Sequence, residues 1–193
     1  MKIPNKFNQP VSLEVLAQGI CACEENARRL IADAEVLIKS GGFLSAINLL
    51  RLAIEEMAKD HLLWQGATYG NQSSAEWEWL WDAFESHKEK LRAVEYEIHW
   101  ASYQDKEEFH RRINILQNQR EHCLYVHFDA QANKFFRPSE LIPDAENLVM
   151  SQYKYALGLY QLFFPVGSQP MDEIIFALKE TEENHRKKTG GQK

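Results

Sequence analysis

Two adjacent carboxylates and a lysine lie together near the centre of the helical stretch from Gly41 to Leu63, GGFLSAINLLRLAIEEMAKDHLL. Glu55 and Lys59 are four residues apart, the spacing at which an acid and a base meet on one face of a helix. Such a pair is often only a solvated surface ion pair. Glu55, Glu56 and Lys59 could instead orient a group that transfers protons. The stretch therefore predicts either an ordinary salt bridge or part of a polar site.

Apolar residues recur at steps of three and four along each predicted helix, which is the pattern of a buried helical face. The helix from Phe43 carries Glu55 and Glu56 beside this seam, while His87 and Arg120 lie within the seams of two later helices. A buried charge must reach water, find a partner or line a cavity. We predict that Glu56, His87 and Arg120 converge in one site; the alternative is a satisfied core histidine and an arginine that extends to solvent.

Arg120 and His127 lie in the segment REHCLYVH, two turns apart and on one helix face if the helix extends that far. An arginine can hold a phosphate and a histidine can transfer a proton near neutral pH. Together they suit metal-independent RNA cleavage, in which the ribose 2′-hydroxyl attacks the neighbouring phosphate. The spacing also occurs by chance in many chains. The candidate ligands Glu55, Glu56, Asp60 and His61 do not have the ExxH spacing of di-metal bundles, so we predict no metal and no cofactor.

The elements that must position these residues form one all-α domain over residues 1–193, a bundle of about five to six helices. Residues 1–11 are a proline-containing arm, Ser12 caps the first helix, and Gly41 with Gly42 ends it. Further helices are predicted from Ser73 to about Ala101, from Asp105, from Pro143 and from Pro170. A small hairpin is predicted near 125–137, and the basic tail 185–193 is predicted to be disordered.

Composition limits the possible settings of the protein. The 193 residues carry a net charge of −6, so RNA binding would need a local basic patch. Three cysteines without CxxC spacing indicate neither a disulfide framework nor a zinc site. No segment is long and apolar enough to cross a membrane, and the N-terminus has no signal-peptide pattern. These features predict a cytoplasmic protein without a membrane partner.

Three ordered blocks resemble the AbiV-type abortive-infection proteins of the HEPN-like superfamily. The stretch from Gly41 to Leu63 resembles the family's glycine-begun helix leading to EExxK, and WDAFESHKEKL resembles its HKxKL segment. REHCLYVHFD with the downstream RPSELIP resembles its arginine-to-LYVDFD block, although His127 stands where the family usually has aspartate. The resemblance implies a HEPN-like bundle, a homodimer and a role in bacterial defence against phage. The substituted His127 gives a spacing similar to the HEPN ribonuclease motif.

The interpretation that follows is an anti-phage effector that cleaves RNA and halts translation or growth of the infected cell. Arg120 would hold the phosphate, His127 or His87 would transfer protons, and Glu56 would act with them. The substrate-positioning residues would be Glu55, Lys59, Lys88, Lys90 and Tyr125. RNA is then the substrate, and a phage-encoded protein is the expected activator. The alternatives are a non-enzymatic protein that blocks translation by binding a phage or host protein, and an antitoxin-like or substrate-binding partner of another enzyme.

Overall fold

The structure is a computed structural model that describes residues 9–68, 74–99, 106–164 and 169–190. The side chains of Arg120 and His127 lie outside this description, as do those of a few other residues. The described elements are α1 (Leu13–Lys39), α2 (Phe43–Thr68), α3 (Ser74–Glu85), α4 (His87–His99), α5 (Lys106–Leu124), β1 (His127–Asp129), β2 (Lys134–Phe136), α6 (Pro138–Leu141), α7 (Ala145–Phe163) and α8 (Met171–Gly190). The predicted all-α class is confirmed, with one small hairpin added.

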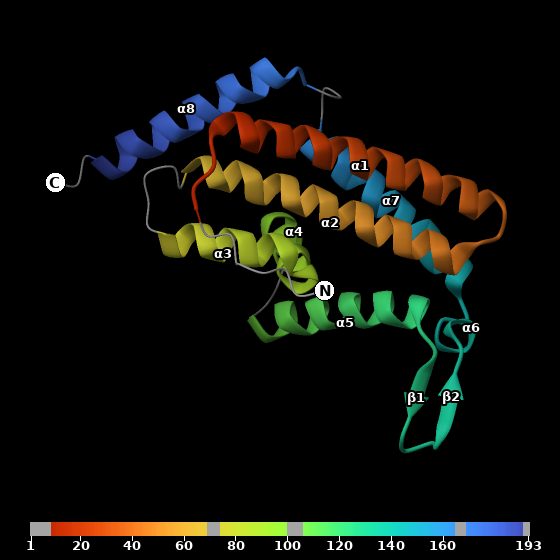
Figure 1. The fold of residues 1–193 in the computed structure, drawn as a ribbon. Helices are drawn as coiled ribbons and strands as arrows, with labels where there is room; N and C mark the ends of the chain where they lie inside the picture. Colours follow the sequence, from red (N-terminus) through yellow and green to blue (C-terminus); the bar gives the residue numbers. More distant parts are fainter. Residues whose placement is uncertain (1–8, 69–73, 100–105, 165–168, 191–193) are drawn as a thin grey trace.

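A hairpin of two long helices, α1 and α2, runs through the centre of the molecule (Figure 1). Ser12 caps α1 by accepting a hydrogen bond from the backbone N–H of Val15 at 3.4 Å. At the other end, Gly41 adopts a positive φ of 77° and the N–H of Gly42 donates to the carbonyl of Leu37 at 2.8 Å. Glycine adopts such a positive φ without strain, so Gly41 determines the turn at the predicted helix break.

Two hydrophobic clusters lie along this helical hairpin. Near the turn, α1 and α2 bury Ile47, Leu50 and Ile54 against α4, α5 and α7. Near the open end, the start of α1 and the end of α2 pack against α3 and α8, around Trp77 and Leu80. Glu55 occurs in the middle of α2, where the helix faces α4.

The predicted third helix is in fact two helices, α3 and α4, separated at Ser86. The side chain of Ser86 accepts a hydrogen bond from the N–H of Glu89 at 3.3 Å, so Ser86 caps α4. This break and the one-turn helix α6 give eight helices among the described residues, more than the predicted five to six. The sequence Ser86-His87-Lys88-Glu89 has the spacing of a capping box, a signal that the periodicity of the seam concealed.

The predicted hairpin is confirmed, and the condition for a shared face of Arg120 and His127, a helix that extends to His127, is not met. Helix α5 ends at Leu124, and His127 pairs with Phe136 at the start of an antiparallel hairpin. Asp129 Oδ1 closes the turn by accepting from the N–H groups of Gln131 and Ala132 at 2.8 and 3.1 Å. Arg120 and His127 therefore do not share a helix face.

The basic end of the chain continues as helix for longer than the predicted boundary at residue 185. Helix α8 extends to Gly190, with ion pairs from Arg186 to Glu182 at 3.0 Å and from Lys187 to Glu183 at 4.0 Å. Basic side chains in a last turn also interact favourably with the helix dipole. Residues 191–193 and most of the predicted arm, 1–8, lie outside the described residues. No described helix is long and apolar enough to cross a membrane.

Candidate active site

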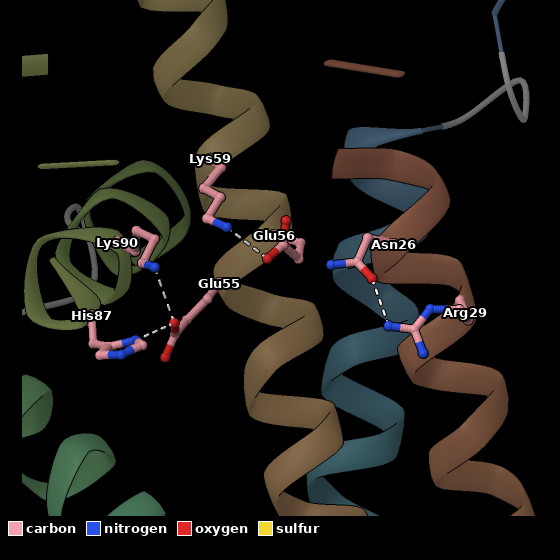
Figure 2. A network of polar contacts seen from close by, with 7 residues as sticks. All are labelled: Asn26, Arg29, Glu55, Glu56, Lys59, His87 and Lys90. Atoms are coloured by element: carbon pink, nitrogen blue, oxygen red, sulfur yellow. Dashed lines mark hydrogen bonds and ion pairs between the residues drawn. The ribbon is translucent and has the colours of Figure 1, made fainter. Parts of the chain in front are cut away.

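A buried carboxylate, Glu55, contacts two basic side chains of α4, His87 and Lys90 (Figure 2). His87 Nδ1 lies 2.5 Å from Glu55 Oε2, and Lys90 Nζ lies 3.2 Å from the same oxygen. The side chains of Glu55 and Lys90 are 2% and 5% exposed, whereas that of His87 is 47% exposed. The site therefore has a buried ion pair at its base and an imidazole that solvent can reach.

The polarity of the contact with Glu55 indicates the tautomer of the neutral imidazole. A carboxylate accepts hydrogen bonds, so the contact assigns the proton of neutral His87 to Nδ1 and leaves Nε2 as the basic nitrogen. Lys90 supplies a positive charge beside the buried carboxylate of Glu55. The arrangement is typical of a histidine oriented for proton transfer.

The second carboxylate, Glu56, does not make the contact with His87. Its Oε1 accepts from Lys59 Nζ at 2.8 Å, and it is close enough to Cys23 on α1 to accept a hydrogen bond from that thiol. Burial, with Glu56 beside it, raises the pKa of Cys23 to about 12. Lys59 also lies 5.2 Å from the centre of the Phe84 ring. Neighbouring positions on a helix point about 100° apart, which separates Glu56 from the Glu55 cluster.

A buried arginine that the sequence analysis did not identify lies one turn before Glu55. Arg51 is 1% exposed, and its Nη2 donates to Gln119 Oε1 on α5 at 2.8 Å. Among the described residues, its Nε and Nη1 atoms have no hydrogen-bond partner. Burial and then Arg112 lower the pKa of Arg51 to about 10, partly offset by Glu95. A single arginine inside the apolar run LLRLAI was the available signal.

The remaining predicted site residues are distributed between α4 and α5. Lys88 is half-buried in the first turn of α4, next to His87. Arg120 directly follows Gln119 on α5, so its backbone lies beside the turn of α2 that carries Arg51 and Glu55. Tyr125 is 64% exposed just beyond the end of α5. The placement of the Arg120 and His127 side chains remains a prediction.

A separate acidic pair is buried between α1 and α2. Burial and then the nearby Glu24 raise the pKa of Asp60 to about 7, with a hydrogen bond from Trp64 acting in the opposite direction. Tyr160 on α7 donates to Glu24 Oε1 at 3.2 Å, and burial followed by Glu24 raises the pKa of Tyr160. In the described part of the chain, no group of three or more His, Cys, Asp or Glu side chains is arranged to hold a metal ion.

The protein is a helical bundle whose polar site is built from side chains on facing helices. Comparison with a family model identifies the family to which this bundle belongs. The model HEPN_AbiV, described as AbiV, matches residues 15–151. The chain belongs to this AbiV family of HEPN-type proteins. The match includes α1 to α6 and the start of α7, and thus all of the site residues described above. No curated protein and no solved structure matches the chain.

Proposed function

We propose that this protein is an abortive-infection effector that cleaves RNA without a metal ion, with His87 as the group that transfers the proton. The observation that carries the proposal is the contact between buried Glu55 and the half-exposed imidazole of His87. Membership of the AbiV family supports the abortive-infection role. A buried partner that orients a solvent-accessible histidine is what general base catalysis requires.

In the proposed reaction, His87 Nε2 takes the proton of the ribose 2′-hydroxyl as its oxygen attacks the adjacent phosphorus. The new O2′–P bond forms while the P–O5′ bond breaks, which gives a 2′,3′-cyclic phosphate and a departing 5′-oxygen. The imidazolium returns its proton to that oxygen, so no net charge accumulates on the protein. Lys90 pairs with Glu55 at the base of the site, and Arg120 stabilises the charge that develops on the phosphate. His127 remains the second candidate for proton transfer.

The acidity of the whole chain favours a selective RNA over indiscriminate binding. At a net charge of −6, affinity for phosphates must come from a few local cations. Lys88 adjoins His87, and Arg111 and Arg112 are exposed on α5. These cations are candidates for contacts with one or two phosphates of a single strand or loop.

The decisive experiment is incubation of the purified protein with total bacterial RNA in the presence of a chelator. Cleavage with chelator present is expected, together with 2′,3′-cyclic phosphate ends. His87→Gln should lower the rate about a hundredfold or more, the contribution of a positioned acid–base group. The matched control is His185→Gln, which changes a half-buried histidine on α8 and should leave the rate unchanged. Equal rates for both variants would remove His87 from the mechanism.

A second candidate, a non-enzymatic protein that blocks translation by binding a phage or host protein, is favoured by the exposed apolar side chains around the β hairpin. Tyr125, Val126 and Phe135 are 64%, 60% and 66% exposed. Apolar side chains gathered on a projecting element often mark a protein-binding surface. A phage-encoded activator could also bind there. Growth arrest with cellular RNA intact would favour this candidate over RNA cleavage.

A further inference from the structure

A cleft of about 340 Å³ is lined on α4 by Glu89, Arg92 and Tyr96 and not by His87, and the proposed reaction does not use it. Its walls come from α2, α3, α4 and α5. Three aromatic side chains line it: Trp79 of α3, Tyr96 of α4 and Phe109 of α5. The cleft is at the small end of the range for ligand sites, so it suits one planar ring system and not a folded segment of protein.

Of the three aromatic side chains that line the cleft, one is buried and two are half-exposed. Phe109 is buried, and its ring lies at 83° to that of Tyr96, with centroids 6.5 Å apart. Trp79 and Tyr96 are 50% and 54% exposed, which leaves large ring surfaces in contact with water. A flat ligand that covered these rings would gain stacking and apolar burial at once.

Polar groups are present at the edge of the same cleft. Arg92 Nη1 and Glu89 Oε1 pair at 2.5 Å, and the side chains are 33% and 36% exposed. Gln65 Nε2 lies 2.9 Å from His61 Nε2 on the α2 side. These side chains offer both donors and acceptors beside the aromatic walls. Stacking surfaces with mixed hydrogen-bonding groups are the chemistry that recognises a nucleobase.

The cleft and the site around His87 and Lys90 are both built on α2 and α4, so one RNA strand could contact both. On α2, the cleft residue Leu62 is seven residues beyond Glu55, roughly 10 Å along the helix axis. On α4, the cleft residue Glu89 directly precedes Lys90, and Arg92 follows it by two residues. An RNA strand whose phosphate contacted His87 could therefore extend around α4 and place a nearby base in the cleft.

We infer that this cleft binds one unpaired base of a single-stranded RNA and so contributes to substrate selection. The inference rests on the proposed RNA cleavage, since only that function brings a single strand to α4. Stacking on an aromatic ring depends little on which base is bound. Hydrogen bonds from the side chains of Gln65 and Arg92 can distinguish between bases. The acidic chain gains affinity in this way without relying on phosphate contacts alone.

The test uses the full chain and the four nucleoside monophosphates as probes, with ribose 5-phosphate as a probe that lacks the base. The indole N–H signal of Trp79 is followed by NMR and assigned with Trp79→Phe. At least one nucleotide should shift this signal in a saturable manner, and ribose 5-phosphate should not. If all four nucleotides leave the Trp79 signal unchanged, the inference is wrong.

Variants test the same cleft with single-stranded oligonucleotides in a His87→Gln background, which prevents cleavage during binding. Trp79→Ala and Tyr96→Ala should each weaken binding about tenfold, as loss of one stacked base predicts. Phe176→Ala is the matched control, because Phe176 is 64% exposed on α8 and outside the cleft. Affinities equal to that of the control would overturn the inference even if the protein cleaves RNA. Nucleotide binding at Trp79 without RNA cleavage would support the cleft and contradict the proposed function.

Discussion

Arg51 precedes Glu55 by one turn on the same face of α2, and the two buried charges contact partners on different helices. Glu55 contacts both His87 and Lys90 of α4. Arg51 makes one described hydrogen bond, to Gln119 of α5, and leaves two buried nitrogens without a described partner. Burying a charge without full compensation costs stability. We therefore propose that the polar seam between α2, α4 and α5 serves function more than stability.

Arg51→Met tests that explanation. Methionine has a similar length and no donors, so the substitution removes the cost of burying the guanidinium. The free energy of unfolding should stay within about 1 kcal/mol of the parent value or rise, while RNA cleavage falls because α5 loses its hydrogen bond at Gln119. Chemical denaturation and the cleavage assay provide the two measurements. A loss of several kcal/mol would show that Arg51 is a structural residue.

Glu55→Gln is expected to be strongly destabilising. The substitution leaves Lys90, which is 5% exposed, without its counter-charge, and loss of one member of a buried pair costs about 3 to 5 kcal/mol. Glu56→Gln is the matched control on the next residue. Its partner Lys59 is 21% exposed and also contacts the Phe84 ring, so a loss of about 1 kcal/mol or less is expected. Equal losses in urea denaturation would contradict the buried-pair interpretation.

Asp60 should make the stability of the protein decrease as the pH rises. Its pKa is raised from 3.8 to about 7, so the folded state holds a proton that the unfolded chain releases above about pH 4. The stabilisation from this proton is complete below pH 4 and is lost as the pH rises through 7. Asp60→Asn removes the titrating group, so the free energy of unfolding of this variant should change less between pH 5 and pH 8 than that of the parent. Asp33→Asn, at a 52% exposed position, should keep the parent slope.

Periodicity in the sequence predicts the bundle well, because each long helix buries one continuous stripe. The Ser12 cap, the Gly41 turn and the hairpin near Asp129 are local chemistry and were therefore also predictable. The break at Ser86 was not predicted, because the apolar spacing continues across it from Leu80 to Leu91.

The site was only partly predictable for the same reason. Periodicity places residues on a helix face, but it does not specify which of two adjacent carboxylates meets the neighbouring helix. Glu55 rather than Glu56 contacts His87 because α4 begins at that histidine and lies across the Glu55 side of α2. Arg51 was overlooked because helix-face reasoning assigns one arginine in an apolar run to solvent, whereas packing of α5 buries it.

The oligomeric state is open to direct measurement, and a homodimer is expected. Two-fold dimers are the commonest oligomers, and a dimer would bring two copies of Lys88 and His87 to one RNA-binding surface if they lie near the two-fold axis. Light scattering at micromolar concentration should give twice the chain mass of 22.5 kDa. If Lys88 contacts RNA and not the dimer interface, Lys88→Glu should weaken RNA binding and leave the measured mass unchanged. A monomer at micromolar concentration would contradict the expectation.

The two histidine candidates can be separated because they lie on different elements. His87 begins α4 beside Glu55, whereas His127 begins β1, beyond the end of α5 at Leu124. If the Glu55 contact selects the base, His87→Gln should lower cleavage about a hundredfold, and His127→Gln should lower it less than about tenfold. Arg120→Ala should also cost about a hundredfold, as loss of a phosphate-stabilising cation does. Circular dichroism should show unchanged helix content in all three variants. The reverse order for the histidines would assign the chemistry to Arg120 and His127 and leave Glu55 with a structural role in the ion pair with Lys90.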